Sequence, residues 1–249
     1  MDVFFIGVGD ACDPQHGNTS ILVKTGNGVN ILFDCGFSVP HSYFAFTGDP
    51  DQLDIIWISH FHGDHFFGLP LLILRLWEMG RSKPLLITGP RGLSDKILTA
   101  MDLAYPSFRS KFCYALQFLE IEPDNAHSIS GLTCQSVQTD HSQRNLGILV
   151  EDGDKKLYYS GDGRPTRQVP ELIKNCDLAV HEAYMLDEEV HHHGSVSGCL
   201  KLAEESCIRQ LALVHLNMAF RRVESAHIGK ILDANPAAIL PEAGLRITV

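Results

Sequence analysis

One short run of polar residues constrains this chain more than any other feature, because it gathers four potential metal ligands directly after an apolar segment. The run reads Ser59-His60-Phe61-His62-Gly63-Asp64-His65 and follows the apolar residues of Ile55–Ser59. His60 and His62 are two residues apart, so an extended backbone points both imidazoles the same way. Asp64 and His65 are adjacent and would face a second position. The run therefore favours two metal ions side by side, most consistent with zinc, with manganese or iron as alternatives.

Two ions need more ligands than this run supplies, and the chain offers three more at the ends of later apolar segments. His141 follows Cys134–Thr139, Asp162 follows Leu157–Ser160, and His215 lies near the end of Gln210–Leu216. A polar residue at the end of a strand is where a site on a rigid scaffold is expected. We therefore expect these three side chains to complete the metal site that begins at His60.

Short apolar runs and a few amphipathic segments predict a layered α/β protein with a single domain over residues 1–249. Strands are expected at Val3–Val8, Ser20–Lys24, Val29–Asp34, Ile55–Ser59, Leu132–Thr139, Gly147–Glu151, Lys156–Ser160, Leu178–His181, Gln210–Leu216 and near Leu245–Val249. Helices are expected at Gly68–Met79, Leu93–Ala104, Ser195–Cys207 and Ile228–Leu232. Asp152-Gly153 predicts a hairpin turn, and Ser94 is expected to cap the helix over 93–104.

Charge and cysteine content narrow the classes of protein to which the chain can belong. Its formal net charge is −10, whereas a broad nucleic-acid-binding face usually brings a basic excess. The seven cysteines form an odd set without a Cys-x-x-Cys pair, which fits reduced thiols in the cytoplasm better than disulfides or a cysteine zinc site. The most apolar stretch, Leu69–Trp77, is far shorter than the roughly 20 residues of a membrane span, so we expect no membrane partner.

The ligand residues together resemble the metallo-β-lactamase superfamily of binuclear hydrolases. The resemblance rests on the residues His60-x-His62-x-Asp64-His65, His141, Asp162 and His215, with Asp34 in Phe33-Asp34-Cys35-Gly36, and it covers nearly the whole chain. It implies an αββα four-layer sandwich with the site at one edge, and it implies that Asp34 supports the metal loop. It also implies a division of the ligands: His60, His62 and His141 on one ion, Asp64, His65 and His215 on the other, and Asp162 bridging.

Three further motifs resemble the ribonuclease Z branch of that superfamily. They are Ser160-Gly161-Asp162-Gly163-Arg164-Pro165, His181-Glu182-Ala183-Tyr184 and His193-Gly194-Ser195. In that branch the second motif reads His-Glu-Ala-Thr and the third reads His-Ser-Thr, so Tyr184, Gly194 and Ser195 depart from the pattern. The resemblance implies that His193 contacts the scissile phosphate and that Glu182 supports His193.

One departure from ribonuclease Z bears on the substrate. Many members of that branch grip transfer RNA with a long arm between the third metal histidine and the bridging aspartate, whereas only 21 positions separate His141 from Asp162. Arm-less relatives include phosphodiesterases that act on small or cyclic phosphate esters. The resemblance therefore implies a small phosphodiester or an RNA 3′ end as the substrate, without a broad nucleic-acid-binding surface. Related proteins are often homodimers, and we expect the same here.

Such a site supplies the local positive charge that the composition lacks. Two divalent ions with Asp64 and Asp162 leave a net charge of about +2. A metal-bound water can have its pKa lowered to about 7, which makes hydroxide available for attack on phosphorus. Asp64 would orient this nucleophile, and a protonated His193 would donate to the leaving oxygen or bind a phosphate oxygen. Arg144 and Arg164 are further candidates for contacts with the phosphate.

Other functions remain open at this point. A carboxyl-ester, lactone or thioester hydrolase would need the same metals but not the pair formed by His193 and Glu182. A non-hydrolytic metal-binding sensor would usually lack one or more of the ligands. The tract His191–His193 would serve as a separate metal-binding patch if it were exposed, and the roles of His191 and His192 are not assigned. The loop after the first strand, which contains His16, is expected to border the site.

Overall fold

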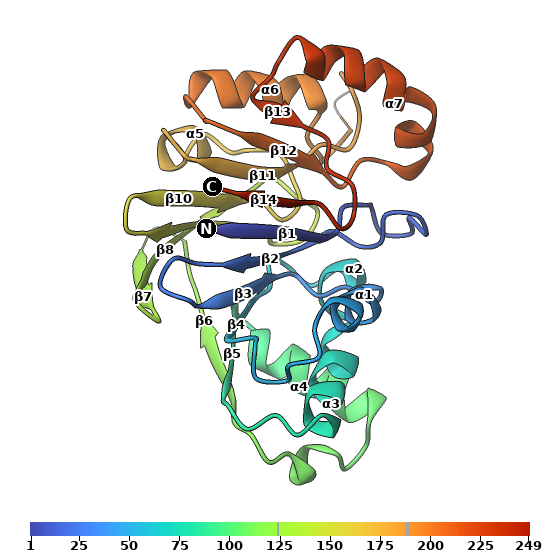
Figure 1. Ribbon diagram of the computed structural model, residues 1–249, viewed down its shortest axis with the longest axis vertical. Helices are drawn as coiled ribbons and strands as arrows, with labels where there is room; N and C mark the ends of the chain where they lie inside the picture. The colour runs from blue at the N-terminus through green and yellow to red at the C-terminus, as the bar shows by residue number, and fades with distance from the viewer. Residues whose placement is uncertain (124, 188–189) are drawn as a thin grey trace.

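Two seven-stranded β-sheets form the centre of the protein. The computed structural model describes residues 1–123, 125–187 and 190–249. Figure 1 shows the chain running from the first sheet, through the second, and back to the first with its last strand. The two chain ends lie side by side on that first sheet, where the amino group of Met1 donates a hydrogen bond to the carbonyl oxygen of Val249 (3.0 Å).

The first sheet combines antiparallel strands near the chain termini with parallel strands beside the metal loop. Its spatial order is β14 (Arg246–Thr248), β1 (Asp2–Gly7), β2 (Ser20–Lys24), β3 (Asn30–Phe33), β4 (Ile55–Trp57), β5 (Leu85–Gly89) and β6 (Leu116–Glu120). Neighbouring strands from β14 to β3 are antiparallel, and those from β3 to β6 are parallel. The carboxyl ends of β3 and β4 therefore meet at one edge, which brings Asp34 and the run from Ser59 to His65 together.

The second sheet has a similar division. Its spatial order is β13 (Ala238–Ile239), β12 (Leu211–Val214), β11 (Leu178–Glu182), β10 (Lys155–Tyr159), β9 (Leu146–Asp152), β8 (Leu132–Gln138) and β7 (Ala126–Ile129). Strands β7 to β10 pair antiparallel, and β10 to β13 pair parallel. Lys155 pairs with Asp152 across the tip of β9 and β10, so the predicted hairpin turn at Asp152-Gly153 is confirmed.

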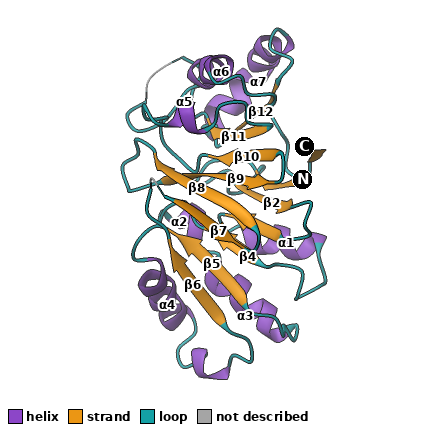
Figure 2. Ribbon diagram, turned by 90° about the vertical axis from the view of Figure 1, so that its left-hand side faces the viewer, coloured by secondary structure: helices purple, strands orange, loops and turns teal. Residues whose placement is uncertain are grey.

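Helices cover the outer face of each sheet, which confirms the predicted αββα sandwich. The helices are α1 (Val39–Phe46), α2 (Gly63–Phe66), α3 (Leu69–Glu78), α4 (Leu93–Ala104), α5 (Val169–Leu172), α6 (Val196–Glu205) and α7 (Met218–Asp233), with the short 3-10 helix η1 (Arg109–Lys111). Figure 2 shows α3 and α4 beside the strands at one end of the molecule and α5, α6 and α7 beside those at the other. Of the helices in the described ranges, none is both long and apolar enough to cross a bilayer.

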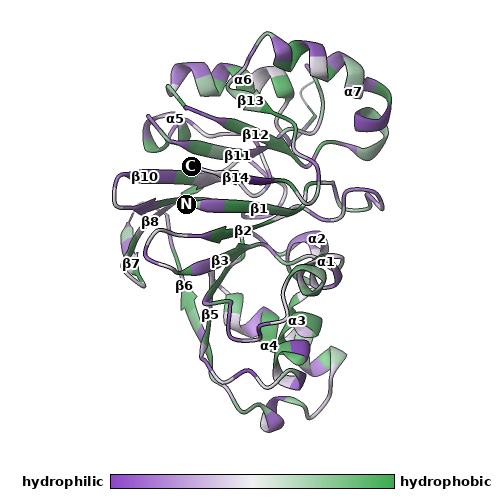
Figure 3. Ribbon diagram, viewed as in Figure 1, coloured by the Kyte–Doolittle hydropathy of each residue, from purple (hydrophilic) through white to green (hydrophobic). Residues whose placement is uncertain are grey.

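Three apolar clusters hold the four layers together. The central cluster lies between the sheets and includes Phe5, Trp57 and Tyr159, while the outer clusters fill the space under the helices of each sheet. Polar and apolar residues alternate along α6 and α7 in Figure 3, as expected for helices with one face on a sheet. Burying each large apolar side chain contributes about 1.5–3 kcal/mol, so these clusters are the main source of stability.

Two details of the predicted helices are wrong. Ser94 does not cap α4, because that helix begins at Leu93 and its N-cap is Gly92, whose φ of 87° suits glycine. Helix α7 begins at Met218, ten residues before the predicted start at Ile228, with the Asn217 side chain accepting a hydrogen bond from Phe220 N. The sequence pattern did not predict the first turns of α7, because the residue buried there is an arginine, Arg221, and not an apolar residue.

Several elements had no sequence prediction. They are α1, α2, β5, η1, β6, β7, α5 and β13. Most are short segments whose regular structure depends on pairing with a neighbouring strand or on packing against a sheet. The strands that precede the candidate ligands were nevertheless predicted at the right places.

A glycine two residues after Asp34, Gly36, sets how closely the metal loop approaches the first sheet. A Cβ atom at Gly36 would collide with the backbone carbonyl of Asp64 and would lie 2.8 Å from Cβ of Asn18. Backbone atoms cannot move aside as a flexible side chain can. The close approach of α2 to the β3–α1 loop therefore requires glycine at this position.

We predict that Gly36→Ala will lower the free energy of unfolding by about 1–3 kcal/mol, the usual cost of inserting atoms into a packed region. Metal affinity should fall with it, because Asp64 must move. Denaturant unfolding and metal analysis would measure both effects. Gly48→Ala is the matched control, since nothing lies within 4 Å of a Cβ added there; equal stability of the two variants would contradict the prediction.

Candidate metal centre

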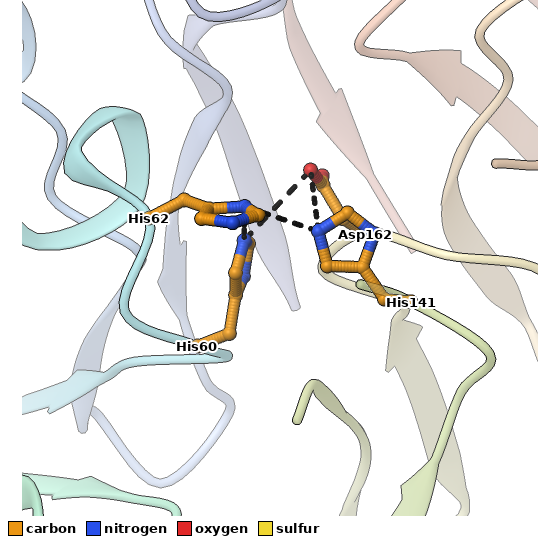
Figure 4. A group of neighbouring side chains, drawn as sticks. All are labelled: His60, His62, His141 and Asp162. Carbon is orange, nitrogen blue, oxygen red and sulfur yellow. Dashed lines mark hydrogen bonds and ion pairs between the residues drawn. The ribbon is translucent and has the colours of Figure 1, made fainter. Parts of the chain in front are cut away.

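The first group of potential ligands is formed by three histidines and an aspartate. One ligand atom each from His60, His62, His141 and Asp162 lies within 4.8 Å of the others. His62 Nδ1 is 3.0 Å from His60 Nε2 and 3.1 Å from His141 Nε2. Figure 4 shows the three imidazoles and the carboxylate converging on one point. These ligands come from the loops after β4, β8 and β10, which belong to both sheets.

The second group shares Asp162 with the first. It contains Asp64, His65, Asp162 and His215, again with one ligand atom each inside 4.8 Å. His65 Nε2 lies 3.2 Å from Asp64 Oδ2 and 3.3 Å from Asp162 Oδ1. His215 Nε2 lies 3.3 Å from Asp64 Oδ2 and 3.5 Å from Asp162 Oδ2. Asp162 therefore offers oxygen atoms to both groups.

The geometry of both groups fits metal ions. Zinc–nitrogen bonds of about 2.0–2.1 Å in a tetrahedral site place two ligand nitrogens about 3.3 Å apart, close to the separations among the three histidines. His65 Nε2 and Asp162 Oδ1 are buried, lie 3.3 Å apart and have no hydrogen-bond partner among the described residues. A buried polar atom without a partner is costly, and a cation between these two atoms would satisfy both.

Asp34 orients His65, a member of the second group, through the ring nitrogen that faces away from the other ligands. Its Oδ2 accepts hydrogen bonds from the Tyr159 hydroxyl (2.7 Å) and the Ser59 hydroxyl (2.7 Å), and it lies 2.8 Å from His65 Nδ1. Its Oδ1 accepts from Ser59 N (2.7 Å). A carboxylate on the far nitrogen of a ligand histidine sets the tautomer and the ring orientation. Asp34 therefore aims His65 Nε2 at Asp64 and Asp162.

Asp162 is held by the backbone of its own loop. The Asn145 side chain donates to the carbonyl oxygen of Asp162 (2.6 Å) and accepts from its amide (3.1 Å). Thr139 Oγ1 donates to the same carbonyl oxygen (2.6 Å). The side chains of Asn145 and Thr139, which flank the loop of His141, thus link the third histidine of the first group to the shared carboxylate.

Burial keeps the imidazoles of the first group neutral. It lowers the pKa of His60 well below the usual value and also lowers the pKa of His62 and of His141. A neutral imidazole has a free lone pair, which is the form that binds a metal ion. The first group is therefore ready to take up a cation at neutral pH.

The second group carries protons when no metal is bound. Burial is the largest single influence and would lower the pKa of His65 and His215. The charge of Asp162 outweighs it only together with other groups, the carboxylate of Asp34 for His65 and the hydrogen bond to Asp64 for His215. The pKa of His65 therefore lies well above the usual value, and that of His215 is raised to about 9. Burial would raise the pKa of Asp162, yet the nearby charges of His215 and His65 keep it well below the usual range.

A cavity of about 350 Å³ opens onto both groups. It is lined by Asp10, Ala11, His62, Gly63, Asp64, His141, Ser142, Asp162, Tyr184, His193 and His215. Asp10 and Ala11 come from the loop after β1, which was expected to border the site, whereas Ser142 and Tyr184 were not predicted to line it. Asp10 accepts a hydrogen bond from Met218 N (2.9 Å) and so ties the loop after β1 to the loop that carries His215. The expectation that this loop borders the site gave the only sequence signal for Asp10.

His193 lies beside the metal ligands and Glu182 lies behind it. Glu182 is fully buried, and its Oε1 accepts hydrogen bonds from Gly163 N (3.0 Å) and Gly194 N (2.8 Å). The same oxygen is 3.5 Å from His193 Nδ1. Glu182 therefore connects the loop of Asp162 with the loop of His193.

The two arginines predicted to contact the phosphate lie near carboxylates. Arg144 pairs with Glu122, and Arg164 Nε lies 3.8 Å from Asp140 Oδ2. Among the described residues that line the cavity, both arginines are missing. His192 Nδ1 lies 3.0 Å from Asp140 Oδ1, and the carbonyl oxygen of His192 lies 3.1 Å from His141 Nδ1. His192, the residue before His193, therefore helps to hold the ring of His141.

Comparison with known proteins agrees with this geometry. Residues 1–231 match the family described as Anti-Pycsar protein Apyc1. The chain belongs to this family. It is 25% identical to ribonuclease Z of Saccharolobus solfataricus over 299 residues, covering 100% of the chain and 99% of the relative, and 26% identical to ribonuclease Z of Methanosarcina acetivorans over 274 residues, covering 88% of each.

Solved structures show the same fold. Human tRNase Z, short form, superposes with a TM-score of 0.82 at 23% identity and covers 100% of this chain and 99% of its own. The metallo-β-lactamase fold protein YhfI from Bacillus subtilis gives 0.79 at 18% identity and covers 99% and 98%. This member of the Apyc1 family is a ribonuclease Z-like protein of the metallo-β-lactamase fold. It is a metal-dependent hydrolase of the nuclease or phosphodiesterase type, and it uses divalent metal.

We predict that the two groups differ in how metal affinity depends on pH. The second group must lose protons from His65 and His215 to bind a cation, so its affinity should rise from about pH 6.5 to about pH 9, near the pKa of His215. The pKa values of the first group are lowered, so its affinity should be nearly constant over this range. Competition with a coloured chelator would measure both binding steps.

His215→Ala provides the control, because it removes a ligand of the second group and leaves the first intact. In this variant only the step that is nearly independent of pH should remain. Two steps with equal pH dependence in the wild-type protein would contradict the prediction.

Proposed function

We propose that this protein is a phosphodiesterase that hydrolyses small phosphodiesters, cyclic ones included, at a pair of divalent ions. The observation that carries the proposal is that two ligand groups share one carboxylate, Asp162, in one small cavity. Two metals about 3.5–4 Å apart are the usual arrangement for displacing one oxygen by another at phosphorus. His60, His62 and His141 would hold one ion, and Asp64, His65 and His215 the other.

The shape of the molecule favours a small substrate. The stretch between His141 and Asp162, where many ribonuclease Z proteins carry a long arm for transfer RNA, is described in full. It consists mainly of the β9–β10 hairpin. A cavity of about 350 Å³ lies at the lower end of the range for small-molecule sites. With a formal net charge of −10, the surface does not attract a polyanion over a broad face. An RNA 3′ end is the alternative substrate, and it would have to enter the same cavity.

When bound, the ions would withdraw charge from the phosphate and make a water molecule reactive. This chain's residues do the remaining work. Asp64 would orient the attacking water, since it lines the cavity together with His215. His193 would donate a proton to the leaving oxygen, and Glu182 would hold the imidazole in place. Three imidazoles in the first group fit zinc best, and the carboxylates also accept manganese or iron.

A substrate screen tests this proposal. The purified protein, loaded with zinc or with manganese, is offered bis-p-nitrophenyl phosphate, a 3′,5′-cyclic nucleotide, a short RNA with a 3′ trailer, a lactone and a thioester. We expect turnover of the first two. His62→Ala and Asp162→Ala should lower it by more than about 100-fold, beyond the loss typical of an outer-sphere partner.

His227→Ala is the control, because His227 is exposed and pairs only with Glu224 among the described residues. Its activity should equal that of the wild type. Turnover of the lactone or the thioester without any phosphodiester would contradict the proposal and favour a carboxyl-ester or thioester hydrolase. Exclusive turnover of the RNA would overturn the assignment of small substrates, and no turnover by the loaded protein would favour a metal-binding sensor.

A further inference from the structure

Tyr184 occupies a place in the site that the proposed function leaves unexplained. It follows His181-Glu182-Ala183 and lines the cavity together with His193 and His215. Its backbone amide donates to the carbonyl oxygen of Gly194 (3.1 Å), the residue after His193. Its carbonyl oxygen accepts from Asn217 N (3.0 Å), two residues after His215. The backbone of Tyr184 is thus tied to the loops of both histidines.

The side chain of Tyr184 is fixed as firmly as its backbone. Its hydroxyl accepts a hydrogen bond from Asn217 Nδ2 (2.9 Å). Asn217 is itself immobilised as the N-cap of α7, where its Oδ1 accepts from Phe220 N (3.0 Å). A ring held at its tip and at both sides of its backbone presents a rigid face to its neighbour.

That face lies against His193. The two ring centroids are 4.6 Å apart and the planes are 28° from parallel. The other contacts of the His193 ring are looser: its plane is nearly perpendicular to that of His141 with centroids 5.1 Å apart, and its Nδ1 is 3.5 Å from Glu182 without a hydrogen bond. His193 is also nearly parallel to His215, at 6.1 Å and 11°. Of the described contacts, the stack with Tyr184 is therefore the one that sets the plane of His193.

We propose that Tyr184 is a positioning residue that holds the His193 imidazole in the plane from which it protonates the leaving oxygen. This inference rests on the proposed function and adds a residue to it. In the reaction, the water oxygen forms a bond to phosphorus and releases its proton to solvent. The ester P–O bond breaks, its electron pair stays on the leaving oxygen, and the proton of the His193 imidazolium passes to that oxygen. His193 then takes a proton back from solvent.

A series of leaving groups separates positioning from mere structural support. p-Nitrophenolate leaves without help, whereas phenolate, whose conjugate acid has a pKa of about 10 like the tyrosine side chain, needs a proton. The substrates are bis-p-nitrophenyl phosphate and diphenyl phosphate. The variants are Tyr184→Phe, which keeps the ring, and Tyr184→Leu and Tyr184→Thr, which remove it. Tyr184 is half-buried. The threonine variant provides a second enzyme without the ring in case the leucine variant does not fold.

We expect Tyr184→Leu and Tyr184→Thr to lower kcat on diphenyl phosphate by about 10–100-fold, part of the factor that a positioned acid supplies. On bis-p-nitrophenyl phosphate the loss should stay below about threefold, and Tyr184→Phe should restore both rates to within about threefold. Metal content and thermal unfolding, measured on every variant, report whether the site is intact.

Equal losses on the two substrates would overturn the inference, because they would indicate a general disturbance of the site. A Tyr184→Phe enzyme as impaired as Tyr184→Leu would overturn it as well, since the stacked ring alone would then not position His193. Neither result touches the proposed function, provided that the wild-type enzyme turns over both diesters. A wild-type enzyme that hydrolyses neither diester refutes the proposed function, and the inference with it.

Discussion

The carboxylate of Asp162 is the point on which the rest of the structure depends. It is buried, it belongs to both ligand groups, and it follows a strand of the second sheet. Four of the other candidate ligands lie in the loop after β4 of the first sheet and in helix α2. A buried carboxylate is unstable without compensating charge. Protons on His65 and His215 provide that charge in the metal-free protein, and metal ions would replace them. The αββα sandwich is the frame that brings the two sheet edges within reach of this one group.

The residues around the ligands explain why the arrangement is rigid. Asp34 orients His65, Asn145 and Thr139 hold the loop of Asp162, and Glu182 joins that loop to the loop of His193. Each of these polar side chains is buried and bonded to backbone or to a ligand. A site supported in this way is set in place before any ion arrives, so little is lost in reorganising it. The tyrosine stacked on His193 extends the same design to the residue that would meet the leaving group.

The sequence marked the candidate ligands because metal chemistry demands particular residue types at particular places. Four candidate ligands in Ser59–His65 were conspicuous, and His141, Asp162 and His215 stood at strand ends that apolar runs had already marked. The same strands predicted a layered α/β domain, and the family resemblance implied the αββα sandwich. The helix over Leu93–Ala104 was predicted with its bounds, since its apolar spacing is regular, although its cap was not. Contacts between residues that are far apart in the chain could not be predicted from the sequence.

Arg144 and Arg164 illustrate that limit. Both stand close to predicted ligands in the sequence, yet Arg144 pairs with Glu122 and Arg164 lies near Asp140, and only the folded chain determines which carboxylates lie within reach. Asp10 and Tyr184 illustrate the converse, because their place in the cavity depends on Asn217 and Met218 at the start of α7. Helix α7 itself was underestimated, since the buried Arg221 interrupts its apolar pattern.

The most direct test of the account is the number of metal ions that each chain holds. Elemental analysis of the purified protein, loaded with zinc and freed of excess metal, should give two ions per chain. The His141→Ala and His215→Ala variants, each of which removes a ligand from one group only, should each retain about one. Well under one ion in the wild-type protein, or a single ion that either variant abolishes, would contradict the claim that two ligand groups share Asp162 to bind a pair of cations.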